Sequence, residues 1–197
     1  MKIILASSSK TRKKILLRSG LKFIQKNPAI NEENEKKKLI NSKISSKKVC
    51  QNLAKEKSVD ISKKIPDSYI IGADSCVIFK NKIFSKPKSK VDAIKKLKAL
   101  NGKKHILYSA VCISLGGKII WRFNDQATLV MRKLNNQEII KYVNSLRSEN
   151  IKSSGLYQLE DIGINLFKKI KGDIFTILGI PLLPLLHFFR NIPNEKN

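Results

Sequence analysis

Residues 69–87, with the sequence YIIGADSCVIFKNKIFSKP, decide the fold of this chain. The first part, residues 69–79, is mostly apolar and rich in β-branched and aromatic side chains, which predicts a strand buried on both faces. Asp74 interrupts this run, and its neighbours Gly72 and Ala73 are small enough to let another group approach. An ionised carboxylate in a dry sheet costs several kcal/mol unless it is paired or binds a cation, so packing alone does not explain Asp74.

Lys86 lies on the return path from this strand, after a hairpin turn predicted at residues 80–82. An acid and a lysine delivered by adjacent strands favour a site for an anionic substrate together with a metal ion. The alternative is a structural ion pair that caps a strand end. We favour the site and keep the ion pair as the second interpretation.

The composition is that of a globular protein with an unusual charge. The chain has 197 residues, 42% hydrophobic and 28% charged, which suffices for one core or one domain in two lobes. We expect a single domain over residues 1–197. The net charge of +25 is typical of nucleic-acid binding or of lysines dispersed over every surface. Because the lysines are dispersed and few aromatic residues lie among them, we do not expect a nucleic-acid partner.

Cysteine usage and apolar segments indicate a cytoplasmic protein without a membrane partner. The three cysteines are far apart and show no CxxC spacing: Cys50, Cys76 and Cys112. This pattern favours neither zinc nor a disulfide framework, and so predicts a reducing compartment. Residues 1–6 are too short an apolar run for a signal peptide. Residues 174–189 are shorter than a bilayer span and are broken by Pro181 and Pro184, so they should be core.

The N-terminus predicts a strand at residues 2–6, a serine-rich turn and a helix that stops at Gly20. Ser9 is a good N-cap, and free backbone N–H groups at a helix start bind anions. Arg12 in the first turn adds a guanidinium, whose paired N–H donors are suited to phosphate. The alternative is an ordinary capped helix with basic surface residues.

The rest of the chain alternates helices and strands, which predicts an α/β fold with a mixed twisted sheet. An extended segment at residues 21–30 leads to an acidic spot at Asn31, Glu32 and Glu33, which is either a solvated turn or part of a site. Residues 36–48 are the expected mobile loop. Helical spacing predicts helices at 49–62, 90–100, 135–146 and 181–189, with Val91 and Ile140 facing inward. Strands are predicted at 105–115, 118–123, 126–132 and 174–179, the first two joined by a Gly116-Gly117 turn, and His105 is expected to be structural.

Five blocks in order along the chain are similar to motifs of the Maf family of nucleotide pyrophosphatases. The blocks are LASSSKTR at 5–12, IGAD at 71–74 with KP at 86–87, LNGKKH at 100–105, GLYQLE at 155–160 and GDIFTILGIPL at 172–182. The resemblance implies a two-lobed α/β fold with a central cleft, like that of inosine triphosphatase, and a possible homodimer as the usual assembly. It also implies Mg²⁺- or Mn²⁺-dependent hydrolysis of nucleoside triphosphates, modified or non-standard ones included, to monophosphate and pyrophosphate.

The resemblance also implies roles for individual residues. Asp74 would be the catalytic base, while Arg12, Lys57 and Lys86 would hold phosphates. Ser7 and Ser9 would line the same end of the cleft as these phosphate-binding residues and, with Glu32 and Glu160, would bind the substrate. Glu32 and Glu160 match acidic or amide positions of the family near substrate and metal. The metal ion would be held by Glu32 and Asp74.

The chain departs from the family pattern at several positions. Lys10 replaces the usual proline, and Asn31-Glu32 replaces a usual pair of acids. Ser75 and Glu160 together match no single branch of the family, so the choice between 7-methyl-GTP and dTTP or UTP stays open. The alternative function is a basic nucleic-acid-binding or partner-binding protein, weakened as a catalyst and linked to cell-division control.

Overall fold

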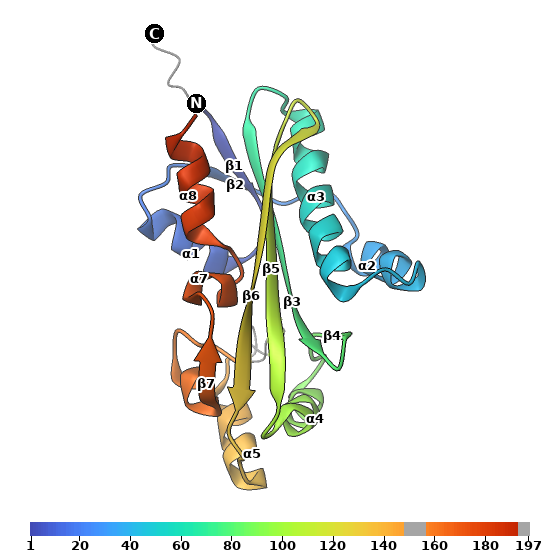
Figure 1. Ribbon diagram of the computed structural model, residues 1–197, viewed down its shortest axis with the longest axis vertical. Helices are drawn as coiled ribbons and strands as arrows, with labels where there is room; N and C mark the ends of the chain where they lie inside the picture. Colours follow the sequence, from blue (N-terminus) through green and yellow to red (C-terminus); the bar gives the residue numbers. More distant parts are fainter. Residues whose placement is uncertain (148–156, 193–197) are drawn as a thin grey trace.

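The computed structural model describes residues 1–147 and 157–192, whose strands form one mixed, open, seven-stranded sheet (Figure 1). The strands are β1 Ile3–Ala6, β2 Ile24–Lys26, β3 Tyr69–Phe79, β4 Lys82–Phe84, β5 Lys104–Leu115, β6 Lys118–Met131 and β7 Phe167–Lys171. Their order is β2-β1-β3-β5-β6-β7, with β4 paired to β3. Helices are α1 Lys10–Arg18, α2 Glu32–Asn41, α3 Ser46–Lys64, α4 Lys90–Leu100, α5 Asn136–Ser145, the 3₁₀ helix η1 Ile162–Leu166, α7 Ile174–Ile177 and α8 Leu182–Arg190. The α/β class with a mixed sheet is confirmed.

The helices divide into two faces and one end of the sheet. In Figure 1, α2 and α3 lie on one side of the long strands, α1, α7 and α8 on the other, and α4 and α5 at the lower end. One apolar cluster joins β1 and β3 to α1 and α8, around Leu5, Ile71 and Leu185. A separate cluster joins β6, α4 and α5, around Leu97 and Val143. These two cores are the expected two lobes.

Side chains of β3 alternate between the two faces, as strand geometry requires. Ile71 and Ala73 pack in the core shared with α1 and α8. Cys76 packs in the cluster that includes residues of α3. The alternation therefore turns the Asp74 side chain toward α3 and the Ser75 side chain toward α1, which their hydrogen-bond partners confirm.

Along the edge of β3 that pairs with β1 and β4, a gap separates these two neighbouring strands. The parallel pairing of β1 with β3 ends at Gly72, and the antiparallel pairing of β4 with β3 begins at Val77. Within the described part of the chain, no strand pairs with residues 73–76 on this side. Asp74 and Ser75 thus lie on a short open edge in an otherwise paired strand.

Gly72 allows α3 to lie directly on β3. A Cβ atom at residue 72 would stand 2.2 Å from the Ala54 carbonyl oxygen and 2.8 Å from the Ser58 backbone nitrogen. Only glycine permits this approach, because the atoms that it would meet are helix backbone. The close contact brings the middle of α3, including Lys57, to the level of Asp74.

Several predicted elements differ in the structure. The expected loop at residues 36–48 is largely helical, because Asn31 caps α2 and Ser45 caps α3. The strands predicted at 118–123 and 126–132 are one strand, β6, whose pairing with β5 continues through residues 124–125. The predicted strand at 174–179 is wrong: Asp173 accepts a hydrogen bond from the Thr176 backbone and starts the short helix α7.

Two residues predicted to face inward are exposed instead. Val91 is 78% exposed in the first turn of α4, and Ile140 is 40% exposed on α5, where Tyr142 is buried in the core. The two-glycine turn at 116–117 agrees with expectation, and the three cysteines are free and buried. None of the described helices combines the length and the apolar character needed to cross a membrane.

Candidate active site

Arg12 is held at the start of α1 by three hydrogen bonds from its guanidinium. Its Nε donates to the Gly179 carbonyl at 2.8 Å, Nη1 to Ser7 Oγ at 3.2 Å and Nη2 to Ser75 Oγ at 3.0 Å. The residue is only 7% exposed. Since a guanidinium carries five N–H groups, one on each terminal nitrogen has no partner among residues 1–147 and 157–192 and is available to another ligand.

The serine turn before α1 is organised around the same arginine. Ser9 caps α1, because its Oγ accepts a hydrogen bond from the Arg12 backbone nitrogen at 3.3 Å. Ser7 Oγ also accepts from the Ser9 backbone nitrogen, and Gln25 Nε2 donates to the Ser7 carbonyl at 2.6 Å. Ser7 and Ser9 therefore lie beside Arg12.

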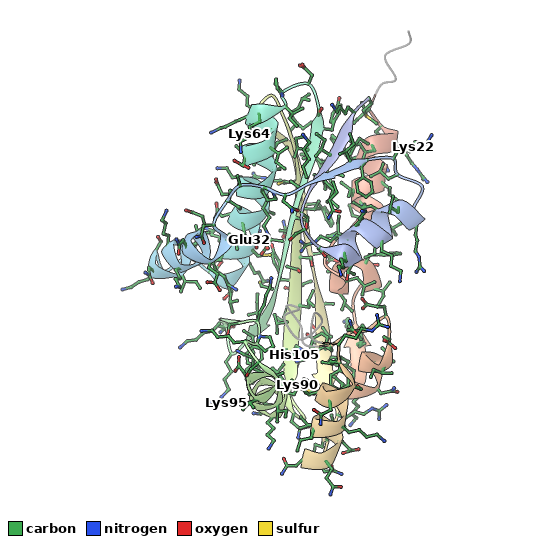
Figure 2. The ribbon with its side chains drawn as sticks, turned by 180° about the vertical axis from the view of Figure 1, so that it is seen from behind. Lys22, Glu32, Lys64, Lys90, Lys95 and His105 are labelled. Carbon is green, nitrogen blue, oxygen red and sulfur yellow. The ribbon has the colours of Figure 1, made fainter. Side chains whose placement is uncertain are left out.

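Lys57 joins two carboxylates on the opposite face of β3. Its Nζ lies 2.8 Å from Asp74 Oδ1 and 3.0 Å from Glu32 Oε2. The side chains of Lys57 and Asp74 are 4% and 13% exposed, whereas that of Glu32 is 43% exposed. Figure 2 shows Glu32 at the end of α2 that is nearer the central strands. The buried ion pair thus includes Asp74, which still has access to solvent.

Lys86 lies just after β4, where the charges of Arg12 and of the Lys57 ion pairs act on its ammonium. Desolvation by the surrounding protein lowers the pKa of its ammonium, while Glu32 and Asp74 oppose this shift. Lys57 and Arg12 also lower that pKa. The residue as a whole is exposed, so solvent weakens these interactions. Lys86 therefore remains an accessible cation at the rim of the site.

Glu160 is not joined to this cluster. It is exposed in the turn before η1, and within residues 1–147 and 157–192 no hydrogen bond or ion pair links it to the residues above. The first part of its motif, residues 155–156, lies outside the described residues. The buried Tyr157 binds His105 instead, at 3.0 Å from its hydroxyl to Nε2.

His105 has the structural environment expected for it. It is 2% exposed, and burial lowers its pKa from 6.5 to about 4. Figure 2 shows His105 in the lower half of the molecule, well separated from Glu32. The histidine therefore belongs to the core of the second lobe.

The charges of the site suit a polyphosphate. Arg12, Lys57 and Lys86 face two carboxylates, so the cluster is cationic and has one buried carboxylate, Asp74, at the open edge of β3. Sequence reasoning identified these residues but not the two partners of Arg12 across the gap. Those partners are Ser75 Oγ and the Gly179 carbonyl. The signal available in the sequence was the glycine at 179, which adopts a left-handed conformation with φ +99° just after α7.

The carboxylates fit a divalent cation that arrives with a substrate. Within the described residues, no three His, Cys, Asp or Glu side chains converge. Glu32 and Asp74 do converge, because both contact the same ammonium. Mg²⁺ is commonly held by one or two protein carboxylates, with water and substrate phosphates completing its shell. The donor set is therefore chemically suited to Mg²⁺ or Mn²⁺ only in a complex with phosphates.

Among solved structures, a dITP/XTP pyrophosphatase from Mycobacterium abscessus aligns with a TM-score of 0.43 and 13% identity. The alignment covers 68% of this chain and 76% of that one. A fold similarity at this level supports no inference about the site.

Sequence relatives are far closer and span the whole chain. A nucleoside triphosphate pyrophosphatase from Pelagibacter ubique is 37% identical over 96% of this chain and 97% of its own. A 7-methyl-GTP pyrophosphatase from Rhizobium etli is 38% identical over 97% and 96% of the two chains. A nucleoside triphosphate pyrophosphatase from Bradyrhizobium diazoefficiens is 40% identical over 96% and 93%. The family described as Maf-like protein matches residues 2–192, and the chain belongs to this family.

Proposed function

We propose that this protein hydrolyses nucleoside triphosphates to nucleoside monophosphate and pyrophosphate. The observation that carries the proposal is the cationic cluster around Asp74 at the open edge of β3. The names of the full-length relatives support the same chemistry, because they describe pyrophosphatases of nucleoside triphosphates and of 7-methyl-GTP. The activity, the roles of the residues and a cytoplasmic location are all parts of this proposal.

Asp74 would act as the general base. Its Oδ1 is fixed by Lys57, and no hydrogen bond within the described residues uses its other oxygen, which can accept a proton from water. The side chain is 13% exposed and its hydrogen bond from Lys57 restricts its orientation, and a positioned base contributes about 10²–10⁴-fold to such a reaction. The water would attack the α-phosphorus, and its proton would pass to Asp74.

The cations would bind the phosphates and stabilise the leaving group. Arg12 offers its two remaining N–H groups, and Lys57 and Lys86 add positive charge from the other face and the rim. Negative charge grows on the pyrophosphate as the bond to the α-phosphorus breaks, so fixed cations favour that state over the ground state. A divalent cation bound with the nucleotide would further neutralise the phosphates and favour ionisation of a water.

A substrate panel in ¹⁸O-labelled water tests the proposal. The purified protein is incubated with Mn²⁺ or Mg²⁺ and with 7-methyl-GTP, dTTP, UTP, GTP or ATP, and both products are quantified. We expect equal amounts of monophosphate and pyrophosphate, with the label in the monophosphate. Release of inorganic phosphate, or label in pyrophosphate, would contradict attack at the α-phosphorus.

The same panel separates the enzyme from the alternative function. The net charge of +25 is the one observation that favours a nucleic-acid-binding protein. Such a protein would bind duplex DNA or RNA with a steep dependence on salt and would turn over none of the nucleotides. The panel also measures which base is preferred.

A further inference from the structure

The backbone of β3 presents hydrogen-bonding groups to the gap between β1 and β4. In a β-strand, the N–H and C=O of one residue point to the same edge, and those of the next residue to the opposite edge. The Tyr69 nitrogen donates to the Lys2 carbonyl at 2.9 Å, so Tyr69 faces the β1 side. By alternation, the odd-numbered residues of β3 should face that side along the whole strand.

The other end of β3 gives the same assignment independently. Lys80 and Asn81 have φ values of +51° and +61° and form a two-residue hairpin turn. Such a turn places the flanking pair, Phe79 and Lys82, in direct backbone hydrogen bonding, so Phe79 faces β4. The register of β3 with β5 runs from Ile70 to Ile78 without a bulge, so the alternation is not reset between the two ends.

Ser75 is therefore the residue whose N–H points into the gap. Two odd-numbered residues, Ala73 and Ser75, lie between the last β1 pairing at Gly72 and the first β4 pairing at Val77. Continuing the register of Tyr69 N with the Lys2 carbonyl places Ala73 N opposite the Ala6 carbonyl, which leaves Ser75. The alternation turns this nitrogen away from β5, and within the described residues no hydrogen bond outside the strand pairings uses it. Since backbone N–H groups in folded proteins are almost always bonded, this donor must serve water or a ligand.

The surroundings of this donor favour an anion. The Ser75 hydroxyl accepts from Arg12 Nη2 at 3.0 Å, so the guanidinium lies beside the open edge. A Cβ atom at Gly179 would lie 3.2 Å from Ser75 Oγ and 3.4 Å from Arg12 Nη2, so a glycine leaves this corner uncrowded. The adjacent Asp74 contacts Lys57 from the other face. The Ser75 N–H therefore lies near two fixed cations, Arg12 and Lys57.

We propose that the main-chain N–H of Ser75 is a phosphate-binding group, which donates a hydrogen bond to an oxygen of the nucleotide's triphosphate. This inference rests on the proposed function. A donor set in the middle of a paired strand cannot rotate away, so it is oriented before the substrate binds. Together with the two remaining N–H groups of Arg12, it supplies hydrogen-bond donors for a charged oxygen beside Asp74.

Amide exchange by NMR tests the donor directly in the intact protein. In the free protein, the Ser75 amide should exchange with water faster than those of Asp74 and Cys76, which face β5. Pyrophosphate with Mg²⁺, or a non-hydrolysable α,β-methylene triphosphate, should slow exchange at Ser75 at least about tenfold. A nucleoside without phosphates should leave it unchanged. If binding is seen elsewhere in the spectrum but Ser75 still exchanges freely, or if the nucleoside alone protects it, the inference is wrong.

Two substitutions at the same residue give a second readout. Ser75→Ala removes the hydroxyl but keeps the N–H, whereas Ser75→Pro removes both, and proline is tolerated where a strand N–H is unpaired. We expect the proline variant to raise KM about tenfold beyond the alanine variant, since hydrogen bonds to charged groups are the stronger ones. Equal KM values in two folded variants would overturn the inference, and amide exchange decides it if the proline variant unfolds.

The outcomes also separate this inference from the proposed function. Turnover and nucleotide binding without protection of the Ser75 amide would contradict the role of this backbone donor and leave the proposed function standing. Absence of both turnover and phosphate binding would overturn the proposed function and this inference together.

Discussion

At the scale of single residues, the shape of Arg12 matters as well as its charge. Its guanidinium makes three hydrogen bonds in fixed directions, which an ammonium cannot reproduce. We expect Arg12→Lys to raise KM for the nucleotide about tenfold or more. Arg18→Lys on the exposed side of the same helix is the matched control and should change neither KM nor kcat. Steady-state kinetics of the two variants check this, and equal KM values would contradict it.

The lowered pKa of the buried His105 should make the stability of the protein depend on pH. The pKa of this histidine is about 4 in the folded protein and 6.5 in an unfolded chain, so between pH 6.5 and about pH 4 the unfolded state binds the proton more strongly. Stability therefore falls as the pH drops from 6.5 toward 4. Between about pH 7 and about pH 4.5 the wild type should lose about 2.5 kcal/mol more unfolding free energy than His105→Phe. Urea unfolding at both pH values measures this, and equal losses would rule out the histidine as the cause.

The sequence predicted the positions of the main charged groups but not how they pair. Asp74 stands out because a carboxylate in an apolar strand needs a partner, and Arg12 because it follows a helix cap. That Lys57 would join Asp74 to Glu32 depends on the packing of α3 and α2, which no local pattern specifies. Glu160 was assigned by resemblance alone, and it stands apart from the other groups in the described structure.

At the scale of secondary-structure elements, the contact of α3 with β3 positions Lys57. A Cβ at Gly72 would overlap helix backbone, so Gly72→Ala should move α3, lower the unfolding free energy by about 1–3 kcal/mol and reduce kcat/KM. Gly116→Ala is the control, because its φ of +56° makes it strained while no atom lies within 4 Å. It should lose about 1 kcal/mol and keep its activity. Wild-type kcat/KM in Gly72→Ala would contradict this role of the helix contact.

Elements with a clear period were predictable, whereas those fixed by pairing or capping were not. The strand at 69–79 and the helix at 90–100 match prediction because their composition and spacing are unambiguous. The sequence of β6 suggests two strands separated by the polar residues 124–125, but these residues pair with β5 and the strand is continuous. α7 is apolar enough to be a strand, but Asp173 caps its first turn and it is helical.

At the scale of the whole molecule, the net charge of +25 should speed the encounter with polyanionic nucleotides. We expect kcat/KM to fall about tenfold between about 20 mM and about 300 mM salt, because salt screens this attraction. The change should be in kcat/KM, with kcat little altered, and the unfolding midpoint over the same range is the control. A flat kcat/KM would mean that the dispersed lysines do not act on the substrate.

Asp74 is the group proposed to activate water, and a single-turnover measurement tests this role directly. The rate of pyrophosphate release is measured at saturating nucleotide for the wild type, Asp74→Asn and the exposed control Asp67→Asn. We predict that Asp74→Asn folds and releases pyrophosphate at least about 100-fold more slowly, while Asp67→Asn keeps the wild-type rate. A folded Asp74→Asn protein that releases pyrophosphate at the wild-type rate would contradict the account.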